Sequence, residues 1–157
     1  MNSITEQLAT LGLSLPAVKA PAANYVSYTL QNNLLMIAGQ IGRAGAAKNG
    51  VVGASIDAEA AKQEAELAAL GVLAVINAVT EGKTERIVQV LRLGVFIAAT
   101  PAFDQHSIVA NGASDLLVAT LGERGRHART AIGVASLPAG AVVEVDAIVQ
   151  LHPESAS

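Results

Sequence analysis

The fold is decided by a stretch near the C-terminus, residues 130–151, which reads TAIGVASLPAGAVVEVDAIVQL. Two runs rich in Val, Ile and Ala, Thr130 to Ser136 and Ala141 to Leu151, flank the sequence Leu-Pro-Ala-Gly at residues 137–140. Proline presets the backbone dihedral that a turn requires, and glycine supplies flexibility. The pattern therefore predicts two strands joined by a tight turn, as in a β-hairpin.

The second of these strands offers apolar residues on both of its faces. Alternation places Val143, Val145, Ala147, Val149 and Leu151 on one face, and Val142, Glu144, Asp146, Ile148 and Gln150 on the other. Two long helices can cover only one face of such a sheet. Because an uncovered apolar face of this size would have to associate, we predict a homo-oligomer that buries it.

The rest of the chain predicts further helices and strands. Ser3 is the expected N-cap of a first helix, with Glu6 as its capping-box partner. In chain order, periodicity and turn signals predict a short helix at Ile4–Leu11, a hairpin of Tyr25–Gln31 and Leu34–Ala38, a long helix at Ala58–Val79, a strand at Arg86–Ala99 and a helix at Ile108–Leu121. The glycine-rich residues 39–53 form either a substrate lid or a plain connection.

Length and composition predict a single domain over residues 1–157, with an N-terminal helix and connector at 1–22 and a core at 23–151. A net charge of -3 and 3% aromatic residues disfavour binding to nucleic acid, which needs basic and stacking side chains. The N-terminus lacks the pattern of a signal peptide, and no window of about 18 uncharged apolar residues suggests a membrane span. We expect a cytoplasmic protein.

Several common kinds of active site lack their usual motifs. Without cysteine, the chain cannot form disulfides, thiolate metal sites or cysteine nucleophiles. His106, His127 and His152 are scattered and do not have the spacing of metal ligands. The sequence contains neither a GxxxxGK[ST] phosphate loop, nor GxGxxG after a strand, nor a GxSxG nucleophile elbow. We therefore expect no metal site, and nucleotide hydrolases, dinucleotide oxidoreductases and serine hydrolases lose their usual support.

Two charged residues stand out in a chain with only 15% charged residues. Arg129 enters the first of the two C-terminal strands, and Glu144 lies in the second. Two interpretations are open. In one, an ion pair between them ties the hairpin together. In the other, they line a pocket in which the guanidinium binds a substrate carboxylate through two parallel hydrogen bonds and the glutamate manages a proton or water.

Several segments, in order along the chain, carry a resemblance to a known family. They are Ala23-Asn24-Tyr25-Val26, Ala38-Gly39-Gln40-Ile41, Val95-Phe96-Ile97, Ala128-Arg129-Thr130-Ala131, Val134-Ala135-Ser136-Leu137-Pro138 and Val143-Glu144-Val145-Asp146-Ala147-Ile148. Together they resemble the YjgF/RidA family, also called endoribonuclease L-PSP. The likeness runs from about Tyr25 to Leu151, and its C-terminal part is the most specific: arginine, then Leu-Pro, then glutamate in a hydrophobic strand.

The resemblance implies a chorismate-mutase-like α+β fold, with a mixed sheet, two long helices on one face and here a short N-terminal helix. It also implies a homotrimer with pockets at the subunit interfaces. The implied activity is the cofactor-free hydrolysis of reactive 2-imino and enamine acids, such as 2-aminoacrylate, to 2-keto acids and ammonia. Arg129 matches the carboxylate-binding arginine, Glu144 the glutamate that handles water, and Tyr25 a tyrosine of the cleft.

The neighbourhood of the arginine departs from the family pattern. Ala131 stands where deaminase members often have cysteine, although the backbone at Thr130 and Ala131 can still contact a substrate. His127 stands where many members have proline. Asn111 lies near an asparagine that some members place at the pocket, with a longer spacing to the arginine than usual. The alternatives are a non-catalytic binder of small carboxylates at the same cleft, or an endoribonuclease or translation inhibitor as in the family's older names.

Overall fold

The computed structural model describes residues 2–18, 20–42 and 48–154. These residues form three α-helices, α1 (Ile4–Thr10), α2 (Ala58–Thr80) and α3 (His106–Leu121), and five strands, β1 (Tyr28–Gln31), β2 (Leu34–Ile41), β3 (Ile87–Ala98), β4 (Ala128–Val134) and β5 (Val143–Leu151). Three short 3-10 helices, η1 (Thr84–Arg86), η2 (Gly122–Gly125) and η3 (Pro138–Gly140), lie between them. The expected α+β class, with a short N-terminal helix, is confirmed.

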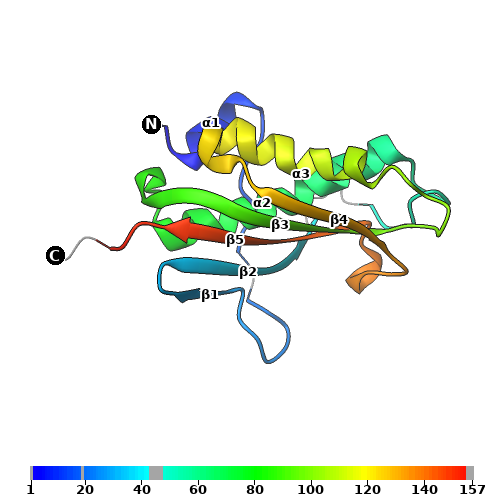
Figure 1. Cartoon of the computed structure of the whole chain (residues 1–157), viewed down its shortest axis with the longest axis horizontal. Coiled ribbons are helices and arrows are strands. Elements are labelled where there is room, and N and C mark those ends of the chain that lie inside the picture. The colour runs from blue at the N-terminus through cyan, green and yellow to red at the C-terminus, as the bar shows by residue number, and fades with distance from the viewer. Residues whose placement is uncertain (1, 19, 43–47, 155–157) are drawn as a thin grey trace.

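The five strands form one mixed sheet in the order β1-β2-β5-β3-β4 (Figure 1). Neighbours are antiparallel except β3 and β4, which run parallel and are joined by α3 as a crossover. A parallel pair needs such a long connection, whereas a tight turn joins antiparallel neighbours. The predicted C-terminal hairpin is therefore wrong. The turn forms as η3, with Ala139 at φ 57°, but it leads from β4 past β3 to β5.

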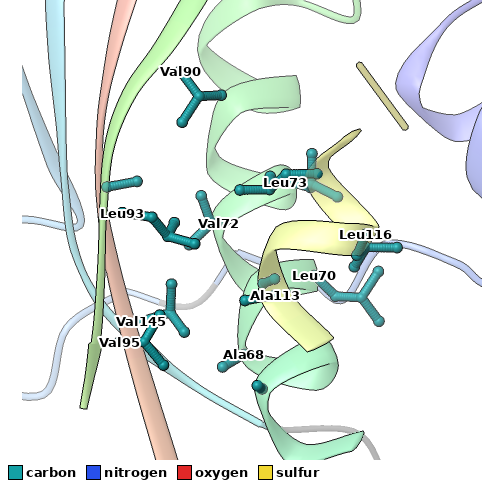
Figure 2. Packing of buried hydrophobic residues seen from close by; sticks show 14 of the residues in the cluster. Ala68, Leu70, Val72, Leu73, Val90, Leu93, Val95, Ala113, Leu116 and Val145 are labelled. Carbon is teal, nitrogen blue, oxygen red and sulfur yellow. The ribbon is translucent and has the colours of Figure 1, made fainter. Parts of the chain in front are cut away.

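Both long helices lie on one side of the sheet, as predicted (Figure 1). Figure 2 shows Leu93, Val95 and Val145 of the sheet facing Val72 and Ala68 of α2. All five side chains are fully buried. This layer is the hydrophobic core, so the side of the sheet that it covers is called the covered face below.

The long helix α2 begins where the sequence predicts. The Asp57 carboxylate accepts a hydrogen bond from the Ala60 backbone N–H at 2.7 Å, which caps the helix. The helix ends at Glu81, which takes a left-handed conformation at φ 54°. By length and composition α2 is the one described helix that could cross a membrane, but 67% of that window is buried inside the fold. Its apolar surface belongs to the core.

The N-terminal helix α1 confirms the predicted capping box. The Glu6 N–H donates to the Ser3 hydroxyl, and the Ser3 N–H donates to the Glu6 carboxylate. The side chains of Ile4 and Leu8 are fully buried, and the helix contacts α3. Because α3 also carries part of the candidate site, α1 packs against the helix that holds it.

The glycine-rich segment divides into parts with different roles. Gly39 belongs to β2, at a β-bulge that falls between Ile37 and Gln40. Farther on, the Val52 N–H donates to the Ala98 carbonyl and ties the segment to the end of β3. The lid hypothesis also concerns residues 43–47, which lie outside the described residues. The described parts of this segment thus belong to β2 or are hydrogen-bonded to the end of β3.

The opposite side of the sheet, called the open face below, is covered by none of the described helices. Met36 on β2 and Ile132 on β4 are 51% and 44% exposed there. Ile148 of β5 pairs with Met36 and is half-buried. The prediction that apolar residues occupy both faces is therefore confirmed.

Candidate active site

Arg129 lies at the sheet edge and points to the covered face. It pairs with Leu93, which is fully buried against the helices. Its Nη1 donates to the Asn111 Oδ1 at 2.9 Å and to the Ser114 Oγ at 3.1 Å, and its Nη2 donates to the Ser107 carbonyl at 3.5 Å. All three acceptors belong to α3, so this helix fixes the direction of the guanidinium.

The charge of Arg129 has no carboxylate partner among the residues that the structure describes. Its hydrogen bonds are to neutral oxygens, and none of the ion pairs within 4.0 Å includes it. Arg126 nearby is paired with Glu123 at 3.0 Å, and the Arg124 Nη1 donates to the Thr84 carbonyl at 2.9 Å. Arg129 is thus a positioned cation that can still take an anion.

His127 extends the same cluster. Its Nδ1 lies 2.6 Å from the Gly125 carbonyl, and its Nε2 lies 2.9 Å from the Ser114 Oγ. Ser114 therefore touches both Arg129 and His127. Ser114 of α3 thus links the side chains of Arg129 and His127, which lie at and just before the start of β4.

The cluster lines an open cleft of about 590 Å³. Its walls are formed by Ser114, Asp115, Val118, Ala119, Arg126, His127 and Arg129. A cleft of this volume accommodates a small metabolite. Another cavity, of about 290 Å³, lies between residues 14–18, the end of β2 and α2, but its lining holds no ionisable side chain. Arg129, His127 and Asp115 therefore share one cleft, whereas His106 lines a separate cavity of about 550 Å³.

Glu144 lies on the open face. Its neighbours in sequence, Val143 and Val145, are buried on the covered face, so the glutamate must point the other way. It stands between Ile41 of β2 and Phe96 of β3. A Cβ at Gly39 would overlap its carboxylate, so only glycine at that position leaves the side chain its room.

Partial burial raises the pKa of the Glu144 carboxyl above its usual range, and the negative charge of Asp146 on the same strand raises it further. Asp146 itself has a partner, the Arg92 Nη1 at 3.3 Å. Glu144 is therefore a half-buried carboxyl group whose neutral form is favoured more than in an exposed glutamate.

A single chain does not bring Arg129 and Glu144 together. Strand β3 lies between β4 and β5, and the two side chains project from opposite faces of the sheet. The interpretation as an intrachain ion pair that ties a hairpin is therefore wrong for the described structure. The pair can share a site only if a second copy of the chain supplies one of them.

The other predicted site residues also lie in different places, some at the Arg129 cluster and some away from it. Asn111 and His127 lie at the Arg129 cluster, and Ala131 follows Arg129 on the covered face, opposite Val95. Thr130 faces the open side, where it pairs with Gly94. Tyr25 is 58% exposed and precedes β1, at the sheet edge opposite β4, so it is far from Arg129 in the same chain.

Sequence reasoning missed Ser114, which touches both Arg129 and His127. A signal for it exists, because residues three apart share one face of a helix, and Ser114 follows Asn111 by three positions. No group of three or more potential metal ligands occurs within the described ranges. His106 lies apart from the cluster, with its ring 5.2 Å from that of Phe103.

The fold and site define a small α+β protein with a cation held at the edge of a half-covered sheet. A family model, Endoribonuclease L-PSP, matches residues 16–151. The chain belongs to this family, which is also called YjgF/RidA. The resemblance stated from the sequence is therefore confirmed.

Individual relatives cover nearly the whole chain. Protein TCP17 of Trypanosoma cruzi is 43% identical over 152 residues, covering 95% of this chain and 94% of the relative. The structure of Atu1372 from Agrobacterium tumefaciens, described as having unknown function, is 42% identical with a TM-score of 0.88 and covers 96% and 94% of the two chains. A candidate endoribonuclease from Shewanella oneidensis is 28% identical with a TM-score of 0.90, over 96% and 100%.

Proposed function

We propose that this protein hydrolyses reactive 2-imino acids and their enamine tautomers, such as 2-aminoacrylate, to 2-keto acids and ammonia. The observation that carries the proposal is Arg129, a cation that α3 orients and that no described carboxylate neutralises. A 2-imino acid presents a carboxylate next to its reactive carbon. Binding that carboxylate places the carbon at a fixed distance from the cluster.

The hydrogen bonds of Arg129 leave room for this ligand. A guanidinium has five N–H donors. Three of them are used by Asn111, Ser114 and the Ser107 carbonyl. The remaining two are the number that a carboxylate accepts in a two-point interaction, the strongest geometry available to arginine.

Glu144 supplies the proton transfer in this proposal. Water attacks the imine carbon, the carbinolamine forms, and ammonia leaves as the C–N bond breaks and the ketone forms. Glu144 accepts a proton from the attacking water and returns it to the departing nitrogen. Imines already hydrolyse in water, so positioning and one proton transfer, together a few kcal/mol, are a sufficient contribution.

The proposal includes a homotrimer whose pockets lie between subunits. Because Arg129 and Glu144 project from opposite faces of the sheet, a site with both takes them from two copies. The open face, with Met36 and Ile132 exposed, is a suitable contact surface. Light scattering tests this directly: a species of 15.9 kDa alone at micromolar concentration would contradict the proposal.

The activity test generates 2-aminoacrylate in place with a pyridoxal-phosphate lyase and follows keto-acid release. Arg129→Ala should lower kcat/KM roughly tenfold to hundredfold, the effect of losing hydrogen bonds to a charged group. Arg129→Lys should restore little of it, since an ammonium cannot make the two-point interaction. Arg126→Gln, which removes a positive charge from the same cleft, is the control, and we expect only a small part of that loss.

A mixing experiment tests the shared site. Arg129→Ala and Glu144→Gln chains, each expected to have lowered activity alone, are unfolded together and reassembled. If the site takes one residue from each of two copies, some sites in the mixture regain both groups and activity returns. Mixed oligomers without activity would contradict the shared site but not the role of Arg129 itself.

The alternatives make different predictions. A non-catalytic binder of carboxylates is favoured by Ala131, which has no thiol. It predicts that a keto acid raises the melting temperature while no turnover occurs. An endoribonuclease is suggested by the family's name, Endoribonuclease L-PSP. It predicts that wild type cleaves RNA and that Arg129→Ala loses this cleavage. Against it, the charge of Arg126 in the same cleft is already paired with Glu123.

A further inference from the structure

We propose that Ser114 and His127 form a nucleophilic dyad that accepts the acyl group of small activated esters. This activity is distinct from imine hydrolysis, which needs no covalent intermediate. The Ser114 Oγ lies 2.9 Å from the His127 Nε2, within the distance required between a nucleophile and its base. Both residues line the open cleft, where a small ester can reach them.

The tautomer of His127 follows from its contacts. The Gly125 carbonyl 2.6 Å from Nδ1 can only accept a hydrogen bond, so Nδ1 carries the proton. In the neutral ring, Nε2 is then a bare acceptor. The hydrogen bond between Nε2 and Ser114 must therefore be donated by the serine hydroxyl, which is the direction that activates a nucleophile.

A third group holds the base in place. Backbone carbonyls and carboxylates both orient a catalytic imidazole by accepting its Nδ1–H, and here the Gly125 carbonyl has that position. A Cβ at Gly125 would overlap the Leu117 carbonyl, so glycine allows this turn to lie against α3. The serine thus comes from α3 and the orienting carbonyl from η2. The base, His127, is the residue just before β4.

Arg129 adds positive charge beside the nucleophile. Its Nη1 donates to the Ser114 Oγ at 3.1 Å, so a developing alkoxide is stabilised before attack. After attack, a carbonyl oxygen bonded to the same centre lies close to this guanidinium. The cluster therefore contains a donor for the oxyanion of a tetrahedral intermediate.

The reaction balances without a co-reactant other than water. The Ser114 Oγ bonds to the acyl carbon while its proton moves to the His127 Nε2. The tetrahedral intermediate expels the alcohol, which takes the proton from His127. Water then attacks the acyl-serine through the same base, releases the carboxylic acid and restores the serine hydroxyl.

The first experiment uses p-nitrophenyl acetate and diisopropyl fluorophosphate with the full-length protein. Wild type should release p-nitrophenol and carry one phosphoryl adduct, located at Ser114 by peptide mass spectrometry. Ser114→Ala and His127→Gln should each slow ester cleavage about a hundredfold, the usual contribution of a general base. The exposed Ser136→Ala is the control. A wild type that acquires no adduct at Ser114 would overturn the proposal.

A second experiment is independent of ester turnover. Because the chain contains no cysteine, Ser114→Cys and Ser136→Cys each introduce a single thiol. Iodoacetamide should alkylate the first at least tenfold faster, since a neighbouring imidazole and cation favour the thiolate. Adding His127→Gln should remove this advantage. Equal rates, or an advantage that survives His127→Gln, would show that the hydrogen bond only links α3 to β4.

Failure here would leave the proposed imine hydrolysis intact, because the keto-acid assay on wild type does not depend on a serine adduct. Labelling at Ser114 without keto-acid release would support the dyad and contradict the proposed imine hydrolysis. The two outcomes are therefore distinguishable.

Discussion

The two faces of the sheet differ in how their side chains are satisfied. On the covered face, apolar residues pack against α2, and the one strand cation, Arg129, is held by three oxygens of α3. On the open face, Glu144 and Asp146 lie in spaces that Gly39 and Gly94 leave free, among exposed apolar side chains. The covered face is packed within one chain, although Arg129 has no described carboxylate partner there. The open face has the composition of a surface that another molecule completes.

The same difference applies to the two side chains that we propose for catalysis. Arg129 has its direction set by a helix of its own chain. Glu144 has only its strand neighbours and the space beside Gly39. A site that combines them is therefore rigid on one side and depends on association for the other.

The largest effect is expected from truncation on the covered face. Leu93→Ala should lower the free energy of unfolding by about 2 to 5 kcal/mol, because it leaves a cavity at a fully buried position. Met36→Ala on the open face should cost the isolated chain little and weaken self-association instead. Chemical denaturation and sedimentation measure the two quantities. Equal losses of unfolding free energy would remove the distinction between the faces.

A smaller effect is expected at the helix that holds Arg129. Asn111→Asp places a carboxylate where an amide oxygen now lies 2.9 Å from the guanidinium, so it competes with a substrate carboxylate. We expect KM to rise roughly tenfold to hundredfold, the value of a charged hydrogen bond. Asn111→Ala, which leaves one Arg129 N–H without its acceptor, should raise KM less. Steady-state kinetics compare them, and the reverse order would contradict the role of Arg129 as a carboxylate ligand.

The fit of Glu144 against β2 can be tested with Gly39→Ala. The added methyl group overlaps the carboxylate, so we expect a loss of about 1 to 3 kcal/mol in unfolding free energy. Glu144→Ala in the same chain removes the overlap and should recover most of the loss. A double-mutant cycle measures this coupling. Additive effects would mean that the carboxylate does not occupy this space.

The smallest effect concerns pH. The raised pKa of Glu144 means that the folded chain binds more protons than the unfolded chain above the ordinary value of 4.5. Stability therefore falls as pH rises through this window. Glu144→Gln cannot ionise, so its advantage over wild type in thermal denaturation should grow from pH 4 to pH 7. An exposed residue, Glu59→Gln, is the control, and a constant difference would contradict the raised pKa.

Local signals predicted most of the elements but not all of their pairing. The capping box at Ser3, the start of the long helix at Ala58 and the alternation along β5 each depend on near neighbours, and each is present. The C-terminal hairpin failed because a turn signal reports only where the chain bends. Whether β4 pairs with β5 or β3 depends on the whole sheet, which α3 closes by a crossover.

The site shows the same limit. Family likeness pointed to Arg129 and Glu144, but only the sheet order shows that they lie on opposite faces. Asn111 could be proposed from the family resemblance, whereas Ser114 required the contact with His127. Hydrogen bonds between a helix and a distant strand depend on side-chain directions in three dimensions, which periodicity does not give.

The crossover that makes β3 and β4 parallel also determines when the cleft forms. Strand β4 has a single neighbour, and it can pair only after α3 has folded back across a long sequence separation. We expect Arg129 and its α3 partners to assemble late in folding and to open early in native fluctuations. The backbone amides of β4 should then exchange with solvent faster than those of β5, which has a paired strand on each side. Arg129 thus lies on an edge strand with low kinetic protection, whereas Glu144 lies on the better protected β5.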